Sequence, residues 1–275
     1  MKKTITIALL TAAVIGATSF FSSCSNKNDD DRIIEGWPDP VTIDLSKVFT
    51  NGMPKEADSM TIQTDDRGLV TGIKTKDETV SFKYDNIKTR VIVIPNVFMK
   101  VERNGDTTFY RMYLNYNGFV RECMIQQKGN TKEDTWRFTY NDNDQLINII
   151  HSADDYKEFT LTYKDSNISE IETKTIVSQT TTRKKDTYKV AYTSDTTPVP
   201  IMNKGNIMLF NTTFGIDMGA IRYAYYAGLL GKATKNLPVQ LIDKNGNKTN
   251  FTWTVNSNGF PTTMTSGSHQ YKFGW

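Results

Sequence analysis

Cysteine and histidine are almost absent from this chain of 275 residues, which contains two of each. Structural zinc sites built from paired cysteines are therefore excluded. Two histidines and a free thiol cannot furnish a usual transition-metal site without help from carboxylates. Glycine-rich phosphate-binding loops and the Rossmann fingerprint are missing as well, which argues against nucleotide cofactors. We expect no metal and no cofactor.

An excess of charge of either sign is also lacking. The chain has 33 basic and 30 acidic residues, and residues 1–23 contain two lysines and no acidic residue, which leaves 31 against 30 beyond them. A nucleic-acid-binding face would need a strongly basic surface, and so would electrostatic attachment to anionic lipid. Nucleic acid is therefore not an expected partner.

A hydrophobic run long enough for a membrane helix is missing from the N-terminus. The apolar stretch from Ile5 to Ala17 is well short of the roughly 20 residues that span a bilayer. Two lysines precede it and small residues follow it up to Cys24, which is the order of parts in a signal peptide. The cleavage box resembles that of bacterial lipoproteins, with Phe21 where leucine is more usual. A secreted protein with an incidental cysteine is the alternative.

Lipidation of Cys24, with palmitate among the acyl chains, is what this resemblance implies. Several chains make a durable anchor, whereas a single chain binds a membrane only marginally. Residues 24–33 are a polar, acidic tether, too hydrophilic to fold. Once Cys24 is acylated, Cys123 is the only thiol left, so no intramolecular disulfide can form.

The residues after Cys24 bear on location. In the lipoproteins that this leader resembles, an aspartate directly after the cysteine retains the protein at the inner membrane, and this chain has Ser25 there. The outer membrane is therefore favoured. The acidic cluster from Asp29 to Asp31 resembles an export signal to the cell surface, and a solvated linker facing the periplasm is the alternative.

Residues 34–275 repeat one pattern five times: an alternating strand, a short Asp/Asn/Gly turn and a second strand. Such turns supply positive φ or side chains that cap their own backbone, as tight hairpins require. The turns lie at 64–73, 115–123, 140–150, 163–171 and 255–264. We expect equivalent first inward residues after them, namely Leu69, Phe119, Leu146, Ile168 and Phe260.

Apolar and aromatic residues alternate with polar ones before the turns, as in a sheet with one wet face. Examples are Val80, Phe82 and Tyr84, and Trp136, Phe138 and Tyr140. Further strands are expected at 90–94, 97–102, 108–114, 187–193, 207–211, 238–242 and 249–255. More than ten antiparallel strands favour an all-β barrel or sandwich, since closure removes exposed edges. The aromatic residues recur along short strands rather than in girdles, which favours a single soluble, lipid-anchored domain over a membrane barrel.

One segment departs from the strand pattern. Apolar residues at 216–230 recur at three- and four-residue spacing, and Gly231 follows where a helix commonly ends. We predict one short helix of about 14 residues near 216–230. Its tyrosines, Tyr223, Tyr225 and Tyr226, are expected to pack against the sheet, with the lining of a pocket as the alternative.

The units YNDNDQLINII and YKDSNISEI are similar to tyrosine–aspartate repeats of bacterial surface proteins. The order of hairpins, then the tyrosine-rich segment with LLGKATKNLPVQL, then a last hairpin resembles a family of gut-commensal Gram-negative lipoproteins with a porin-like fold and no known function. The resemblance covers roughly residues 55–275. It implies a wide, barrel-like antiparallel sheet, and it transfers no catalytic or binding residue.

Candidate chemistry is sparse, and we assign no catalytic residue. His151 is followed by Ser152, Asp154 and Asp155, the residue types of a hydrolytic triad, but without the strand-to-helix elbow, so a turn is expected there. His269 has no obvious partner. Turn chemistry accounts for four aspartates that a glycosidase or a calcium site would also use, namely Asp65, Asp66, Asp142 and Asp144.

Two functions of different class remain open. The first is a non-enzymatic surface binding or adhesion module for a glycan or protein, motivated by aromatic faces that stack on sugars, namely Trp37, Trp136, Trp253 and Trp275. The second is an extracellular glycan or peptide hydrolase. A carrier for a hydrophobic ligand inside the barrel is a weaker alternative.

Overall fold

The computed structural model describes residues 42–85, 95–127, 134–177 and 182–275. The signal peptide and tether predicted for residues 1–33 lie outside this range, as do Cys24 and Trp37, and so does the strand predicted at 90–94. In the described residues no helix is long and apolar enough to cross a membrane.

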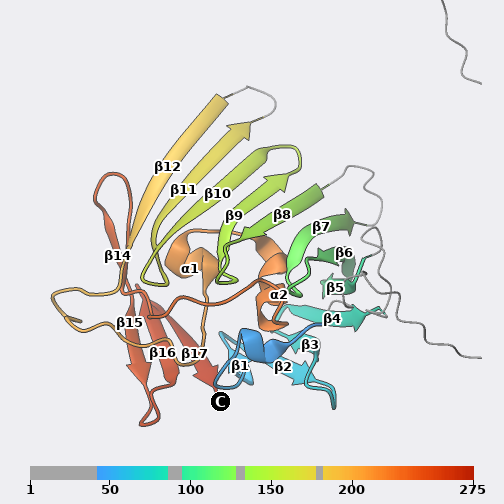
Figure 1. Cartoon of the computed structure of the whole chain (residues 1–275), viewed down its shortest axis with the longest axis horizontal. Coiled ribbons are helices and arrows are strands. Elements are labelled where there is room, and N and C mark those ends of the chain that lie inside the picture. Colours follow the sequence, from blue (N-terminus) through green and yellow to red (C-terminus); the bar gives the residue numbers. More distant parts are fainter. Residues whose placement is uncertain (1–41, 86–94, 128–133, 178–181) are drawn as a thin grey trace, which may run out of the picture. The chain divides into compact units, whose positions relative to one another are not determined.

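Seventeen strands in the described ranges form one antiparallel sheet (Figure 1). Strands β1–β12 precede the helices α1 (Phe210–Phe214), η2 (Gly219–Arg222) and α2 (Tyr223–Tyr226) in the chain, and β13–β17 follow them. The first twelve are β1 (Glu56–Ala57), β2 (Met60–Thr64), β3 (Val70–Lys74), β4 (Glu78–Tyr84), β5 (Val97–Arg103), β6 (Asp106–Leu114), β7 (Val120–Gln127), β8 (Asp134–Tyr140), β9 (Leu146–Ser152), β10 (Tyr156–Lys164), β11 (Asn167–Val177) and β12 (Thr182–Ala191). The last five are β13 (Gln240–Ile242), β14 (Lys248–Asn250), β15 (Thr252–Val255), β16 (Pro261–Ser266) and β17 (His269–Gly274).

The sheet nearly closes into a barrel through its last strands. β1 pairs with both β2 and β17, which joins the C-terminal hairpin to the N-terminal ones. β14 pairs with β13, while β15 pairs with β16, and only the buried Phe251 separates β14 from β15. The chain thus steps from one ladder into the other at Phe251, whose N–H donates to the carbonyl oxygen of Val239. The predicted all-β, barrel-like architecture is confirmed.

Four of the five predicted hairpin turns share one hydrogen-bond pattern. A side-chain Oδ1 accepts from the backbone N–H groups two and four residues further on, at 2.9–3.0 Å. The accepting residues are Asp65, Asn115, Asn141 and Asn256. Asp243 does the same in the β13–β14 turn. The fifth predicted turn is a two-residue one, in which Asp165 and Ser166 both have positive φ. The predicted turn chemistry is therefore present.

The strand registers correct one expectation about these hairpins. The residues that occupy equivalent positions are Val70, Val120, Leu146, Ile168 and Pro261, which pair with Thr64, Leu114, Tyr140, Tyr163 and Val255. Leu69, Phe119 and Phe260 lie one residue earlier, at the position that the buried Gln145 occupies in the third hairpin. The error arose because the third hairpin has the polar Gln145 where the others have Leu69, Phe119 and Phe260, so its first apolar residue after the turn comes one position later.

An aromatic side chain fastens each of these hairpins to a later strand of the sheet. The hydroxyl or indole N–H donates to the backbone carbonyl oxygen of the first residue of a hairpin's second strand, or in β11 of its second residue, at 2.7–3.1 Å. The donor–acceptor pairs are Tyr84–Val70, Tyr140–Val120, Tyr163–Leu146, Tyr192–Ile168 and Trp275–Pro261. The sequence repeat therefore corresponds to a repeated tertiary contact.

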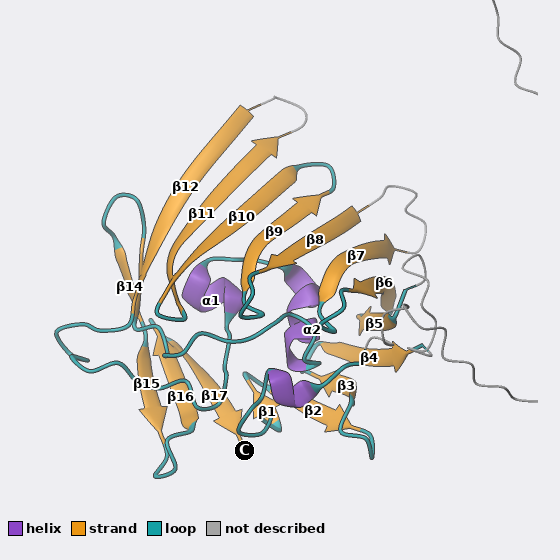
Figure 2. Cartoon of the chain, in the orientation of Figure 1, coloured by secondary structure: helices purple, strands orange, loops and turns teal. Residues whose placement is uncertain are grey.

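Residues 201–239, here called the inner segment, lie on the concave side of the sheet and contain the helices α1 (Phe210–Phe214), η2 (Gly219–Arg222) and α2 (Tyr223–Tyr226) (Figure 2). A further short helix, η1 (Leu45–Lys47), precedes β1. The strand predicted at 207–211 is wrong: this stretch is a loop that leads into α1. Four successive apolar residues there are buried, and such a run fits a buried loop or helix as well as a strand.

The helix predicted near 216–230 is present but shorter than 14 residues, because η2 and α2 together cover 219–226. Ala227 follows as the C-cap residue, and Gly228 then turns the chain with a φ of 72°. Gly231 therefore does not end the helix, although its φ is also positive.

The end of the inner segment crosses three of the hairpin turns. The backbone N–H of Val120 donates to the carbonyl oxygen of Leu229, the N–H of Lys232 to that of Asp144, and the N–H of Lys235 to that of Ser166. At Gly231 a Cβ atom would lie 2.5 Å from the Asp144 carbonyl oxygen and 2.9 Å from the Tyr140 ring. Only glycine permits this approach, so the segment closes over the turns at this end of the sheet.

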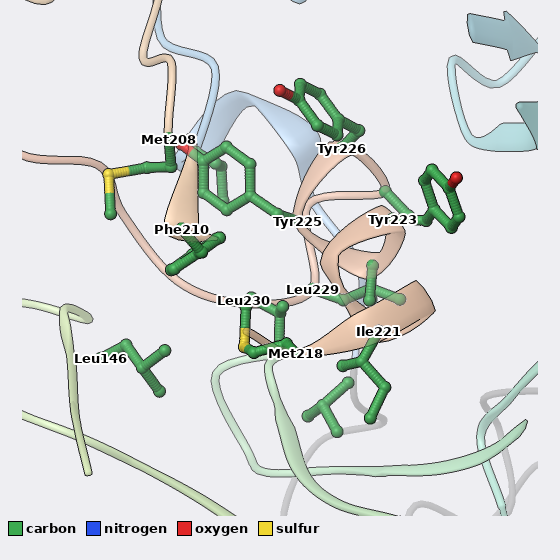
Figure 3. Close-up of a cluster of buried hydrophobic side chains, with 14 of the residues drawn as sticks. Leu146, Met208, Phe210, Met218, Ile221, Tyr223, Tyr225, Tyr226, Leu229 and Leu230 are labelled. Atoms are coloured by element: carbon green, nitrogen blue, oxygen red, sulfur yellow. The ribbon is translucent and has the colours of Figure 1, made fainter. Parts of the chain in front are cut away.

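Side chains of the inner segment and of the inward-facing strand positions form one hydrophobic core (Figure 3). Tyr225 is central: its ring makes edge contacts with Phe49, Phe210 and Tyr226, at centroid distances of 5.5–5.6 Å. Its hydroxyl donates to the carbonyl oxygen of Asn206. Tyr225 therefore packs in the core, as expected.

Candidate functional site

A hollow of about 500 Å³ lies between the inner segment and the first strands of the sheet. Its walls come from the β1–β2 and β3–β4 turns, from α1, from the loop before η2, from α2 and from β17. A second hollow, of about 830 Å³, adjoins the β5–β6 turn and shares Glu78 and Arg103 with the first. Volumes of a few hundred Å³ are typical of small-molecule sites.

Glu78 is the most engaged charged group in this hollow. It opens β4, and its backbone N–H donates to Oγ1 of Thr75, which shapes the β3–β4 turn. Its side chain is 12% exposed. The Tyr223 hydroxyl donates a hydrogen bond to Oε2, and the guanidinium groups of Arg222 and Arg103 lie 3.5 and 3.9 Å from the two carboxylate oxygens. Two cationic side chains therefore face this carboxylate.

Arg222 and Tyr223 form a short relay to this carboxylate. Nη2 of Arg222 donates to the Tyr223 hydroxyl over 2.7 Å, and that hydroxyl donates to Glu78. Nη1 donates to the Gly219 carbonyl oxygen, and the guanidinium carbon lies 4.4 Å from the Tyr223 ring centroid. Burial, and then the hydrogen bond to Glu78, raise the pKa of Tyr223. The tyrosine is therefore a fixed neutral donor at neutral pH.

Asp58 stands on another wall of the hollow, and His269 lies beside it. Asp58 lies in the β1–β2 turn with a φ of 45°, and its Oδ1 is 3.6 Å from Nε2 of His269. Burial raises the pKa of the Asp58 carboxyl, and the interaction with His269 opposes this shift. The structure thus gives His269 the partner that the sequence did not reveal.

Tyr226 also lines the hollow, and its side chain is 2% exposed. Its hydroxyl has no hydrogen-bond partner, and it is the one buried side-chain nitrogen or oxygen in the described ranges of which this is true. In Figure 3 the Tyr226 hydroxyl points away from Leu229 and Leu230, which follow α2 in the chain. Burial raises the pKa of Tyr226, so the group is a neutral, unused donor and acceptor.

The residues with triad chemistry near His151 do not assemble a nucleophilic site. His151 and Ser152 lie in strand β9 rather than in the expected turn. Nε2 of His151 lies 2.8 Å from Oδ1 of Asp134, on β8, and its ring stacks on Trp136 at 4.1 Å. The carboxylate that it engages is thus that of a neighbouring strand.

The aspartates of the turns act as turn residues, as expected. Asp65 caps its own turn and pairs with Arg67, and Asp144 contacts Lys232 and Asn117. In the part of the chain that the structure describes, no three His, Cys, Asp or Glu side chains are grouped to hold a metal ion. Cys123 is buried, and burial raises the pKa of its thiol, which makes the thiol unreactive.

The tryptophans do not form a stacking platform in the described residues, which corrects one motive for sugar binding. Trp136 is buried beneath His151. Trp253 and Trp275 donate their indole N–H groups to the carbonyl oxygens of Pro238 and Pro261, each over 2.7 Å. Their role is to fasten the C-terminal hairpins.

Sequence reasoning missed most of the hollow. Asp58, Glu78, Arg103 and Arg222 belong to separate elements, and no motif connects them. The sequence pointed to this hollow in one way, through the alternative that the tyrosines of the helical segment line a pocket. Tyr223 and Tyr226 do line it.

Comparison with known proteins places the chain in a family. Residues 60–263 match the domain of unknown function DUF4595, with porin-like fold, and the chain belongs to this family. The family with a porin-like fold, inferred from the hairpins and the tyrosine-rich segment, is thereby confirmed, and its lipoprotein character stays a prediction. No curated protein matches the chain significantly.

Two crystal structures share the fold. A porin-like protein from Bacteroides uniformis ATCC 8492 is 18% identical, with a TM-score of 0.54 over 79% of this chain and 91% of that one. A porin-like protein from Bacteroides vulgatus ATCC 8482 is 11% identical, with a TM-score of 0.51 over 82% and 99% of the two chains. At these identities the likeness concerns the fold alone.

Proposed function

We propose that this protein is a lipid-anchored outer-membrane protein, exposed on the cell surface, that binds a small polar ligand without turning it over. The anchor is Cys24, and the acidic tether carries the β domain away from the membrane. The observation that carries the binding role is the buried Tyr226 hydroxyl without a partner, on the wall of a hollow that also holds Glu78. Buried polar groups are nearly always hydrogen-bonded, so an exception calls for an explanation, and a bound ligand supplies one.

The hydrophobic-carrier alternative is not favoured. Side chains of the inner segment fill the core of the sheet, and seven charged residues line the hollow. An apolar ligand would have to desolvate these charges at considerable cost.

A hydrolase is the second candidate, supported by one observation. Asp58 and Glu78 line the same hollow in different surroundings, since burial raises the pKa of Asp58 while two arginines face Glu78. Two carboxyl groups in contrasting environments are the arrangement of many glycosidases. Turnover separates this candidate from the binding module.

The binding role is tested with the full-length lipidated protein, purified in detergent. Its melting temperature is measured against a library of small polar compounds and short glycans, and each hit is then checked for product formation. A hit that raises the melting temperature and remains intact supports the binding module. Product formation favours the hydrolase, and the absence of any hit contradicts both proposals.

Surface exposure is tested separately on intact cells. Proteinase K added outside should remove the β domain from an exposed lipoprotein, while a periplasmic control protein survives. Full protection of the domain in intact cells, with digestion after lysis, would show that it faces the periplasm.

A further inference from the structure

We propose that the hollow bounded by Glu78, Arg222 and Tyr226 takes a neutral, polyhydroxylated ligand, a short saccharide, and that the Tyr226 hydroxyl hydrogen-bonds to one of its hydroxyl groups. This inference rests on the proposed binding function and names its ligand class. Three features of the hollow carry it: the unpaired hydroxyl, the balance of charge and the aromatic walls.

The unpaired Tyr226 hydroxyl points to a ligand with hydroxyl groups. The tyrosine is buried and neutral, and its hydroxyl both donates and accepts. A ligand hydroxyl satisfies both capacities at once, whereas a carboxylate or an ammonium group satisfies one. The neighbouring Tyr225 differs in this respect, because its hydroxyl is already bonded to the Asn206 carbonyl oxygen.

The charges around the hollow nearly cancel, which disfavours an ionic ligand. The acidic residues on its walls are Asp58, Asp77, Glu78 and Asp217, and the basic ones are Lys76, Arg103 and Arg222. An anion would meet the four acidic groups, and a cation would meet two guanidinium groups. A neutral ligand avoids both repulsions and still finds strong donors and acceptors.

Glu78 and Arg222 retain hydrogen-bonding capacity for such a ligand. A carboxylate accepts about four hydrogen bonds, and among the described residues Oε1 of Glu78 has only the distant Arg103, at 3.9 Å. Arg222 uses one N–H of each terminal nitrogen on Gly219 and Tyr223, while its side chain is 46% exposed. Adjacent acceptor and donor groups suit the vicinal hydroxyls of a sugar ring.

Aromatic side chains complete the walls of the hollow. Phe210, Tyr223, Tyr226 and Tyr271 all border it, and the Tyr271 hydroxyl is held by Thr212 at 2.9 Å. Aromatic surface beside a few polar groups is the usual composition of a small-ligand site. Phe210, Tyr223 and Tyr226 are at most 4% exposed, so the half-buried Tyr271 offers the accessible apolar surface for the C–H face of a sugar ring.

The test uses the full-length protein in detergent on an array of neutral glucose-, galactose- and mannose-based oligosaccharides, with uronic-acid oligosaccharides as the ionic arm. We expect binding in the neutral arm. The Tyr226→Phe variant, which lacks only the unpaired hydroxyl, should bind at least ten-fold more weakly while its melting temperature stays the same or rises. Tyr225→Phe is the matched control: it should melt at a lower temperature and keep its affinity.

Several outcomes would overturn the ligand assignment. Binding confined to the uronic-acid arm contradicts a neutral ligand, and equal affinity of the wild type and Tyr226→Phe contradicts the contact. A protein that ignores both saccharide arms but binds another compound of the polar library loses this inference and keeps the proposed binding function. Silence with every compound removes both.

Discussion

The hydroxyl of Tyr140, at the end of β8, donates a hydrogen bond over 2.8 Å to the backbone carbonyl oxygen of Val120, at the start of β7. The N–H of Val120 donates in turn to the Leu229 carbonyl oxygen of the inner segment. One residue therefore links a hairpin, the next strand and the segment that crosses the turns. Equivalent aromatic bonds at four other hairpins make this contact the repeating unit of the fold.

Loss of the Tyr140 hydroxyl should weaken the domain. In Tyr140→Phe the buried Val120 carbonyl oxygen loses its side-chain donor, and we expect the free energy of unfolding to fall by about 1–2 kcal/mol. Urea denaturation followed by circular dichroism measures this. Tyr116→Phe, at a position that is 66% exposed, is the control and should change little. Equal effects in both variants would contradict the structural role of the bond.

Gly231→Ala should be among the most damaging glycine substitutions. Its Cβ would meet the Asp144 carbonyl oxygen and the Tyr140 ring, and its φ of 78° is unfavourable for alanine. We expect a loss of about 2–4 kcal/mol in unfolding free energy. Gly246→Ala has a φ of 84° and open space around it, so it should lose only about 1–2 kcal/mol. The difference between the two variants measures the close approach of the inner segment.

Asp58→Asn should raise stability at high pH. Burial raises the pKa of Asp58, so the native state binds this proton more tightly than the unfolded state, and stability is lost as pH rises through the native pKa. The variant should melt above the wild type at pH 8, and the difference should shrink towards pH 4. Asparagine also tolerates the φ of 45° at this position.

Asp243→Asn is the control of opposite sign. Hydrogen bonds from the Asn247 side chain and then from backbone N–H groups lower the pKa of Asp243, so its charged form is favoured in the native state. The substitution should not raise the melting temperature at pH 8. A similar gain in both variants would show that general charge, and not the burial of Asp58, sets the effect.

Cys24→Ala should abolish acylation and membrane association. Membrane fractionation of cells, with metabolic labelling by palmitate, measures both. Cys123→Ala is the matched control, because Cys123 is buried within the β domain, and this variant should remain acylated. Complete membrane recovery of Cys24→Ala would contradict the predicted anchor.

The fold was predictable from the sequence where the signal was local. Asp65, Asn115 and Asn256 each precede their turns with the same spacing to a glycine, and that chemistry is written in four or five consecutive residues. In the third hairpin the prediction matched Leu146, instead of Gln145, with Leu69 and Phe119 of the first two. Gln145 is polar and yet buried, because its side chain is hydrogen-bonded to the Ser166 carbonyl oxygen. The strand predicted at 207–211 was wrong for a related reason. A segment that is buried on all sides has no alternation of apolar and polar residues from which its structure can be predicted.

By itself the sequence determined the hairpins, the all-β class, the place of the helical break and the family, because turn residues and two-residue alternation act over a few neighbouring positions. The lipid anchor at Cys24 stays a prediction from the sequence. Only the tertiary structure decided how the sheet closes at Phe251, which tyrosines fasten the hairpins, and that Asp58, Glu78, Arg222 and Tyr226 border one hollow. These contacts join residues far apart in the chain, and only the folded arrangement of strands and inner segment brings them together.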